Sequence, residues 1–360
     1  MGIKKLSNLI KDYSPGCIQR RKLQDYNGKI IGIDLSIYLY RFSYREGNPC
    51  TSILMQAMRL MKNGALPVYF IDGKPPKEKE GELMARADKR NEATESIDFL
   101  KRFIQNPSIE VPEKFEKYRV MSEENLENEI VYINNSLIQI PQQTRVDIKK
   151  MFDYMGIPYI EVNGEAEALC AKLNREGYID GCMSEDTDIL ANGGKIFIRG
   201  FANTSNYVDE YNLEVLLRDL GVDYKKFVDI CIMCGCDYTG TIGGISYATA
   251  FKYIKKEGDI ETIVKKYCVN NQDNKIYYRQ GFETTCECDY ERAREMFLED
   301  ISEGELKKAE DRVEFKQPNV EELLKLVKVS EKVEKQIRKN LPEYYWKLKD
   351  LRLKNPEKHI

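Results

Sequence analysis

Seven carboxylates stand where the sequence predicts that buried strands end or helices begin. They are Asp34, Asp72, Glu165, Glu167, Asp186, Asp188 and Asp237. In an open parallel sheet, functional sites form beyond the carboxyl ends of the strands. The pattern therefore predicts that these side chains converge on one site.

A cluster of this many carboxylates favours divalent-metal chemistry. Like charges at close range raise one another's pKa and destabilise the fold unless cations bind between them. Mg²⁺ takes oxygen ligands, and two metal ions about 3.5–4 Å apart form an arrangement that cleaves phosphodiesters. The plainer alternative is that each acid caps a helix or faces solvent. Asp34 and Asp72 argue against that alternative, because apolar residues precede both of them.

Alternating strands and helices are predicted to position these acids. Apolar strands are expected at 29–34, 67–72, 157–162, 178–184 and 195–199, and helices at 35–42, 51–63, 143–155, 211–219 and 224–236, with another helix starting at Glu165. Continuous apolar strands separated by helices indicate an α/β fold with a mostly parallel central sheet flanked by helices. The charged stretch 79–105 and the proline-broken stretch 106–141 are predicted to form an exposed excursion. Residues 268–290 are polar and irregular, and 319–352 form a Lys/Glu-rich helix.

The composition limits the chemistry further. Among 360 residues there is one histidine, His359, which argues against a Ser-His-Asp or Cys-His nucleophile and against a histidine-ligated zinc site. Lysine and arginine number 56 against 59 acidic residues, so the net charge is −3. That balance excludes nucleic-acid binding by bulk positive charge, but it allows a local basic patch.

The apolar segments and cysteines indicate the compartment. No apolar run reaches the length of a membrane span, and the first residues lack a signal-peptide core. The ten cysteines lie mostly in apolar segments, so we expect buried free thiols in an intracellular protein. A metal site made of Cys231, Cys234, Cys236, Cys286 and Cys288 is the lesser alternative, because the spacing of a zinc ribbon is not kept.

A set of short motifs runs in order through about residues 1–265. They are Met1–Ile10, Ile33–Tyr40, Asp72–Pro76, Lys79–Arg86, Met155–Tyr159, Glu165–Ala168, Ser184–Asp188 and Gly235–Tyr238. Together they resemble the flap endonucleases, in the XPG-like group of structure-specific 5′ nucleases. The resemblance implies an N-terminal nuclease region at 1–105, a helical arch at 76–142 and an internal nuclease region at 143–265 with a helix–two-turn–helix element. A C-terminal α-helical extension at 266–360 has no assigned role.

The resemblance also implies roles for individual residues. The seven acids would bind two Mg²⁺ ions, for which Mn²⁺ can substitute. Lys79 and Arg86 match the basic pair at the base of the arch; two helical turns apart, they share a face and can neutralise the scissile phosphate. Tyr40 matches the aromatic residue on which the family stacks an unpaired base. Gly2 matches the residue that lies beside the active site in the family. Further candidate DNA contacts are Arg45, Gly235, Thr241, Gly243 and Gly244.

Several positions depart from the family pattern. Within Thr239–Ala250, which resembles the element that binds K⁺ and a downstream duplex, Ser246–Ala248 replace a usual glycine and basic residues, so K⁺ is only a candidate cofactor there. The segment between the helix of Tyr40 and the helix that starts near Thr51 is shorter than in typical flap endonucleases, so the resemblance leaves recognition of a one-nucleotide 3′ flap open. The stretch from Asp72 to Glu165 is long and acidic around Glu123–Glu129, which predicts an enlarged arch with a face that repels DNA. No sliding-clamp docking motif is recognisable.

The sequence thus predicts a monomeric, Mg²⁺-dependent 5′ nuclease that cleaves 5′ flaps in branched DNA during replication and repair. It is expected in the nucleus or at another site of DNA replication. One alternative is a 5′→3′ exonuclease or a junction-resolving relative with the same chemistry. Alternatives of other classes are a catalytically silent DNA-binding scaffold and a metal-dependent phosphohydrolase that acts on RNA or nucleotides.

Overall fold

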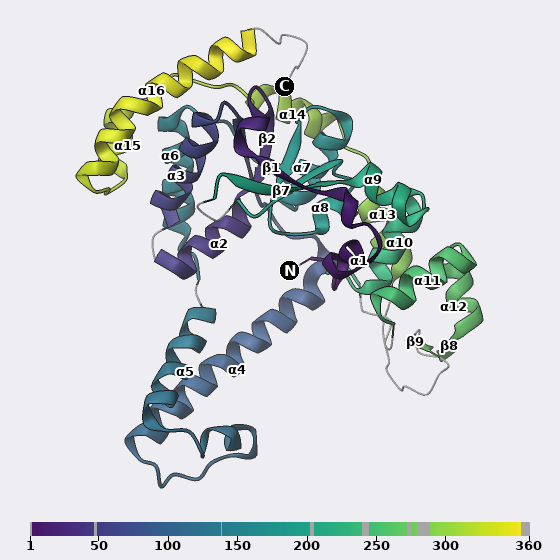
Figure 1. The fold of residues 1–360 in the computed structure, drawn as a ribbon. Helices are drawn as coiled ribbons and strands as arrows, with labels where there is room; N and C mark the ends of the chain where they lie inside the picture. The colour runs from purple at the N-terminus through teal and green to yellow at the C-terminus, as the bar shows by residue number, and fades with distance from the viewer. Residues whose placement is uncertain are drawn as a thin grey trace.

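A seven-stranded mixed sheet lies at the centre of the computed structural model, which describes residues 2–46, 49–137, 139–201, 205–239, 245–271, 275–278 and 289–353. The strands are β1 (Ile18–Lys22), β2 (Ile30–Asp34), β3 (Leu66–Ile71), β4 (Tyr159–Glu161), β5 (Gly181–Met183), β6 (Ile196–Arg199) and β7 (Tyr207–Asn212), in the order β1-β7-β6-β5-β2-β3-β4. The pairs within β2–β6 are parallel, and β7 runs antiparallel to β6 and β1. Figure 1 shows the sheet at the centre of the body, with helices around it. The predicted mostly parallel sheet is confirmed.

The two antiparallel strands at one edge were not predicted. β1 exposes Gln19, Arg20, Arg21 and Lys22, so it contains no apolar run. β7 likewise mixes buried and exposed positions. An antiparallel strand with one solvated face needs few apolar residues, which hides it from a search for buried parallel strands.

Helices pack around the sheet and bury its central strands. They are α1 (Leu6–Tyr13), α2 (Leu35–Glu46), α3 (Pro49–Lys62), α6 (Gln142–Met155), α7 (Ala166–Glu176), α8 (Asp188–Ala191), α9 (Leu213–Leu220), α10 (Tyr224–Cys234), α11 (Tyr247–Glu257) and α12 (Ile260–Tyr267). β2 and β3 are buried along their whole length. Gly32 in β2 permits this close packing, because a Cβ there would lie 2.6 Å from Cys170 Sγ of α7.

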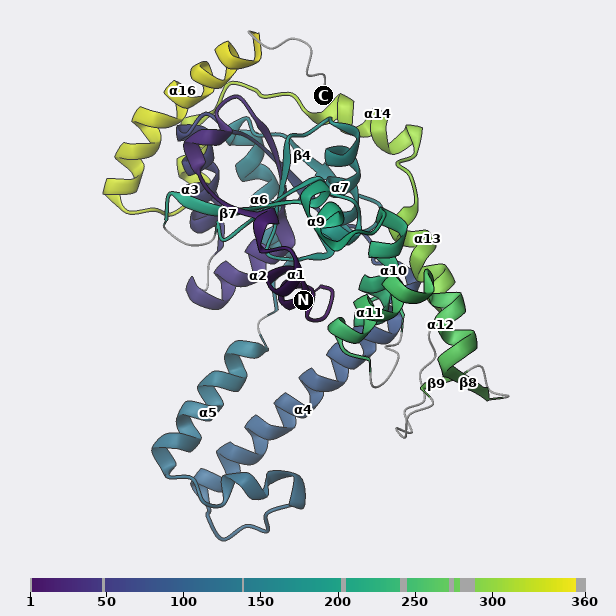
Figure 2. The same ribbon diagram turned by 45° about the vertical axis from the view of Figure 1, so that its right-hand side comes forward.

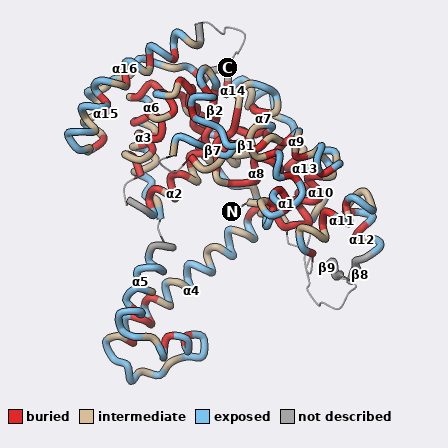
Figure 3. Tube along the Cα trace, in the orientation of Figure 1, coloured by how far each residue is buried: buried red, intermediate tan, exposed pale blue. Residues whose placement is uncertain are grey.

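The predicted excursion is a long arm that projects from the body (Figure 1). It consists of α4 (Glu80–Gln105), a 3₁₀ turn at Glu113–Tyr118 and α5 (Glu123–Ser136). Its outer half has a hydrophobic cluster of its own, made of Ile97, Phe99, Leu100, Phe103, Phe115, Tyr118, Leu126 and Ile133. Figure 3 shows buried positions at this end of an otherwise exposed arm. The arm therefore has a separate small core.

The C-terminal helices return to the body. They are α13 (Tyr290–Leu298), α14 (Glu303–Arg312), α15 (Val320–Leu326) and α16 (Glu331–Leu353), and they follow a two-stranded sheet of β8 (Cys268–Asn271) and β9 (Lys275–Tyr278). α15 packs on α6 and α16 packs on α3; Figure 2 shows α16 on the same side of the body as α3. Ile337, Leu341 and Leu348 join the main core. The single helix predicted at 319–352 is instead two helices, because the chain leaves the helix between Leu326 and Glu331.

The cysteine prediction is confirmed where the structure describes the side chains. Cys17, Cys50, Cys170, Cys182, Cys231, Cys234 and Cys236 are free and buried. Cys286 and Cys288 of the alternative metal site lie outside the described residues. None of the described helices is both long enough and apolar enough to cross a membrane.

Candidate active site

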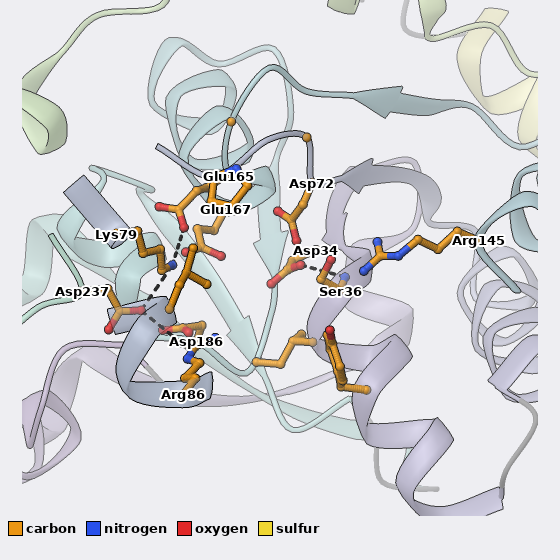
Figure 4. Close-up of a pocket in the computed structure, with 16 residues that line it drawn as sticks. Asp34, Ser36, Asp72, Lys79, Arg86, Arg145, Glu165, Glu167, Asp186 and Asp237 are labelled. Atoms are coloured by element: carbon orange, nitrogen blue, oxygen red, sulfur yellow. Dashed lines mark hydrogen bonds and ion pairs between the residues drawn. The ribbon is translucent and has the colours of Figure 1, made fainter. Parts of the chain in front are cut away.

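Six of the seven predicted acids line one cavity of about 310 Å³ at the carboxyl edge of the sheet. They are Asp34, Asp72, Glu165, Glu167, Asp186 and Asp237 (Figure 4). Asp34 ends β2, and Asp72 directly follows β3. Asp186 lies between β5 and α8, and Asp237 follows α10. The parallel strands thus bring these acids to one place, as the sequence indicated.

A chain of hydrogen bonds fixes one side of this cluster and connects the seventh acid, Asp188. The Ser184 hydroxyl donates to Asp34 Oδ2 at 3.0 Å and accepts from the Asp186 N–H at 3.0 Å. Asp186 Oδ1 accepts from the Asp188 N–H at 3.1 Å. Asp188 Oδ1 accepts from the Ile3 N–H at 2.7 Å. The N-terminal segment is therefore part of the site.

Burial and mutual repulsion perturb these carboxyl groups. Burial, with a further contribution from the charge of Asp72, raises the pKa of Asp34 to about 7. Burial also raises the pKa of Glu167, Asp186 and Asp188 above their ordinary values. A carboxylate held in its charged form at such a place requires a compensating cation.

Lys79 and Arg86 supply part of this compensation. Lys79 Nζ forms ion pairs with Glu165 and, at 3.2 Å, with Asp237. Burial lowers the pKa of Lys79, but the carboxylates of Glu167 and Glu165 outweigh this effect and hold the pKa above its usual range. Arg86 Nη2 lies 3.4 Å from Asp237. The two residues predicted from the base of the arch thus bridge α4 to the acid cluster.

The donor set fits hard divalent cations such as Mg²⁺. Every acidic ligand candidate offers oxygen atoms, which is the preference of Mg²⁺, and burial together with the neighbouring carboxylates raises the pKa of Asp34 and Glu167. Within the described part of the chain, no three acidic, histidine or cysteine side chains are already arranged as ligands of a single ion. Lys79 instead occupies the space beside Glu165 and Asp237.

The remaining sequence candidates fall into three groups. Tyr40 lines the cavity and is 46% exposed, which leaves its ring accessible. Gly2, at φ +85°, lies against Asp186 and Asp188, where a Cβ has no room. Gly235 accepts a hydrogen bond from the Lys4 N–H at 3.0 Å, so it connects α10 to the N-terminal segment. Thr241, Gly243 and Gly244 lie outside the described residues, as does the side chain of Arg45.

Sequence reasoning missed four residues of the site. Ser184 and Tyr238 stood inside quoted motifs without a role; the Tyr238 hydroxyl donates to Glu165. Ser36 directly follows the Asp34–Leu35 pair and lines the cavity. Arg145 lines it from α6. No sequence signal separates Arg145 from the other basic residues on the helix 142–155, so only the fold could reveal it.

Comparison with known proteins identifies two family models in this chain. The XPG N-terminal domain matches residues 1–93, and the XPG I-region matches residues 156–237. Flap endonuclease 1 of Cryptosporidium muris is 31% identical over 350 residues, covering 90% of this chain and 67% of the relative. Flap endonuclease 1 of Caenorhabditis elegans is 32% identical over 315 residues, covering 83% of this chain and 74% of the relative.

Solved structures share the fold at lower identity. The catalytic core of Rad2 in complex with DNA substrate is 16% identical with a TM-score of 0.61, covering 97% of this chain and 100% of that one. The Holliday junction-resolving enzyme GEN1, in complex with product DNA and Mg²⁺, is 16% identical with a TM-score of 0.53, and the match covers 96% of this chain and 77% of that one. A eukaryotic junction-resolving enzyme GEN-1 binding with potassium is 15% identical with a TM-score of 0.55, and the match covers 97% of this chain and 77% of that one.

Proposed function

This chain belongs to the flap endonuclease family, and from that premise we propose that it is a metal-dependent, structure-specific 5′ nuclease acting on flapped DNA. It hydrolyses phosphodiester bonds at the base of 5′ flaps, in DNA replication and repair. The observation that carries the proposal is the cavity in which six carboxylates face Lys79 and Arg86. Because its substrate is DNA, the enzyme works inside the cell; a nuclear location stays a prediction.

The acids are proposed as ligands of two Mg²⁺ ions, for which Mn²⁺ can substitute. The proposed set is Asp34, Asp72, Glu165, Glu167, Asp186, Asp188 and Asp237. When bound, Mg²⁺ supplies the Lewis acid that activates the attacking water and stabilises the leaving oxygen. The donor chemistry supports this proposal, and the GEN1 structure with product DNA and Mg²⁺ is consistent with it. The K⁺ proposal concerns the element Thr239–Ala250, of which residues 240–244 lie outside the described residues.

The chain's own residues have distinct proposed tasks at the DNA strand. Lys79 and Arg86 neutralise the scissile phosphate and the charge that develops on it in the transition state. Tyr40, exposed at the cavity wall, stacks on an unpaired base next to the cleaved bond. Ser184 holds Asp34 and the Asp186 backbone in place, so these carboxylates keep their orientation when substrate arrives.

Cleavage of labelled branched DNA tests the proposal. A 5′ flap, a double flap, a nicked duplex and a four-way junction are incubated with Mg²⁺ or EDTA, using the wild type and Asp186→Ala. Asp209→Ala, at an exposed position of β7, is the matched control. We expect Mg²⁺-dependent incision at the base of the flap, lost in Asp186→Ala and kept in Asp209→Ala.

Each other result has a definite meaning. Binding of DNA without cleavage of any substrate contradicts the nuclease proposal and leaves a DNA-binding scaffold. Incision of the nick or of the four-way junction in preference to the flap keeps the chemistry and indicates an exonuclease or a junction-resolving enzyme.

A further inference from the structure

Arg145 lies on the wall of the cavity opposite the two predicted cations. It belongs to the first turns of α6, which begins at Gln142, where the chain returns from the arm. Lys79 precedes α4, where the chain enters the arm. Figure 4 shows the Arg145 guanidinium pointing toward Ser36 and Asp34, on the far side of the cavity from Lys79 and Asp237. A cation thus stands at each root of the arm.

The two walls differ in how their cations are engaged. Lys79 and Arg86 form ion pairs with Glu165 and Asp237. Among the residues that the structure describes, none forms an ion pair or hydrogen bond with the Arg145 side chain. Its five N–H donors are therefore available to an anion that enters the cavity.

A second observation at the same wall supports a binding role. The Ser36 hydroxyl is buried and has no hydrogen-bond partner within the described structure, and Ser36 lines the same cavity as Arg145. Buried hydroxyl groups in native proteins are nearly always satisfied, so an unsatisfied one calls for a partner. After rotation of the Ser36 side chain into the cavity, a phosphate oxygen between Ser36 and Arg145 would accept from both side chains.

We propose that Arg145, assisted by Ser36, is a positioning residue that binds the phosphate next to the scissile one on the cleaved strand. The planar guanidinium matches the two non-bridging oxygens of a phosphodiester. Asp34 and Asp72 lie between this wall and the Lys79 wall in Figure 4. Because carboxylates separate the two walls and Lys79 and Arg86 are assigned to the scissile phosphate, we assign the neighbouring phosphate to Arg145. This inference rests on the proposed nuclease function.

Variants at Arg145 give the first test. Arg145→Ala should lower kcat/KM on a 5′ flap about ten- to a hundredfold, the range of a charge-assisted hydrogen bond. Arg145→Lys keeps the charge but not the bidentate geometry, so it should recover part of that loss. Lys150→Ala, at an exposed position of the same helix, is the matched control and should cleave like the wild type.

A neutral phosphate analogue tests the contact itself. Flap substrates carry a single methylphosphonate on the 5′ side of the scissile phosphate, on its 3′ side, or at a remote position. For the wild type, the analogue at the contacted position should lower cleavage as much as Arg145→Ala does. For Arg145→Ala, the same analogue should cost nothing further, because two changes to one contact are not additive. The methylphosphonate position whose effect is not additive with Arg145→Ala identifies the phosphate that Arg145 contacts, and so tells whether that phosphate belongs to the flap or to the duplex.

The outcomes separate this inference from the proposed function. If the wild type cleaves the unmodified flap but the losses are additive at every position, Arg145 contacts no neighbouring phosphate and the inference is wrong. A shift in the Mg²⁺ dependence of Arg145→Ala that is the same for all substrates also overturns it, because Arg145 would then only balance the acids. If the wild type does not cleave the unmodified flap, the proposed function fails first.

Discussion

The buried carboxyl group of Asp34 makes the stability of the metal-free protein depend on pH. Burial, with a contribution from Asp72, raises its pKa to about 7. In the unfolded chain the pKa returns to about 4. Between these values the folded protein holds a proton that the unfolded chain has released. The free energy of unfolding therefore falls as the pH rises, and the loss is complete once the pH passes the folded pKa.

The size of this effect follows from the two pKa values. From pH 6 to pH 8, the protonated fraction of Asp34 in the folded state falls from about nine-tenths to about one-tenth, and the free energy of unfolding drops by about 1.4 kcal/mol. Burial raises the pKa of Glu167 and Asp188 too, so their ionisation acts in the same direction.

Urea unfolding in EDTA at pH 6, 7 and 8 measures this slope. Asp34→Asn should reduce the drop in the free energy of unfolding between pH 6 and pH 8 by about 1.4 kcal/mol. Asp209→Asn, at an exposed acid on β7, should leave that drop unchanged. Because Mg²⁺ binds charged carboxylates, it should raise the free energy of unfolding more at pH 8 than at pH 6. A wild-type stability that is flat or rises between pH 6 and pH 8 in EDTA refutes the reasoning. So does a slope that Asp34→Asn does not alter.

Three further substitutions test other parts of the structure. Gly2→Ala places a methyl group against Asp186, so we expect cleavage to fall about a hundredfold while the melting temperature stays near that of the wild type; normal cleavage would contradict the placement of Gly2. Phe99→Ala removes the ring at the centre of the arm's cluster, at a cost of about 3–5 kcal/mol. Hydrogen exchange should quicken in the arm alone, and equal quickening in the central sheet would argue against a separate core. Arg294→Ala leaves the buried Asp229 without its ion pair, so denaturant unfolding should show a loss of about 3–5 kcal/mol; a loss below about 1 kcal/mol would show that Asp229 finds another partner.

The central sheet and its acids were predictable because each rests on a local signal. The apolar runs before Asp34 and Asp72 are long enough to identify buried parallel strands, and the carboxyl edge of such a sheet is a known place for sites. The separate core of the arm was not predicted. Phe99 and Phe115 meet across a stretch broken by prolines, so no single helical period connects them.

Residues whose role depends on tertiary position alone could not be predicted. Arg145 looks like any basic residue of an exposed helix until α6 is placed beside the cavity. The buried side of the C-terminal helix α16 does carry a sequence signal, because Ile337, Leu341 and Leu348 recur at helical spacing and are among the residues it buries. Its many lysines and glutamates obscured that stripe, although they lie on the solvated face.

The ion pairs of Lys79 predict a coupling between the proposed binding of cations and the proposed binding of DNA. Its ammonium group pairs with Glu165 and Asp237, so a phosphate bound there would compete with both carboxylates for the same positive charge. Cations bound by these carboxylates would weaken the hold of the acids on Lys79, and a phosphate bound at Lys79 would free the acids for cations. Because linkage between two ligands is reciprocal, each should raise the affinity for the other by the same factor. We therefore expect the acids and Lys79, which lie in separate sequence motifs, to exchange partners together when cations and DNA bind.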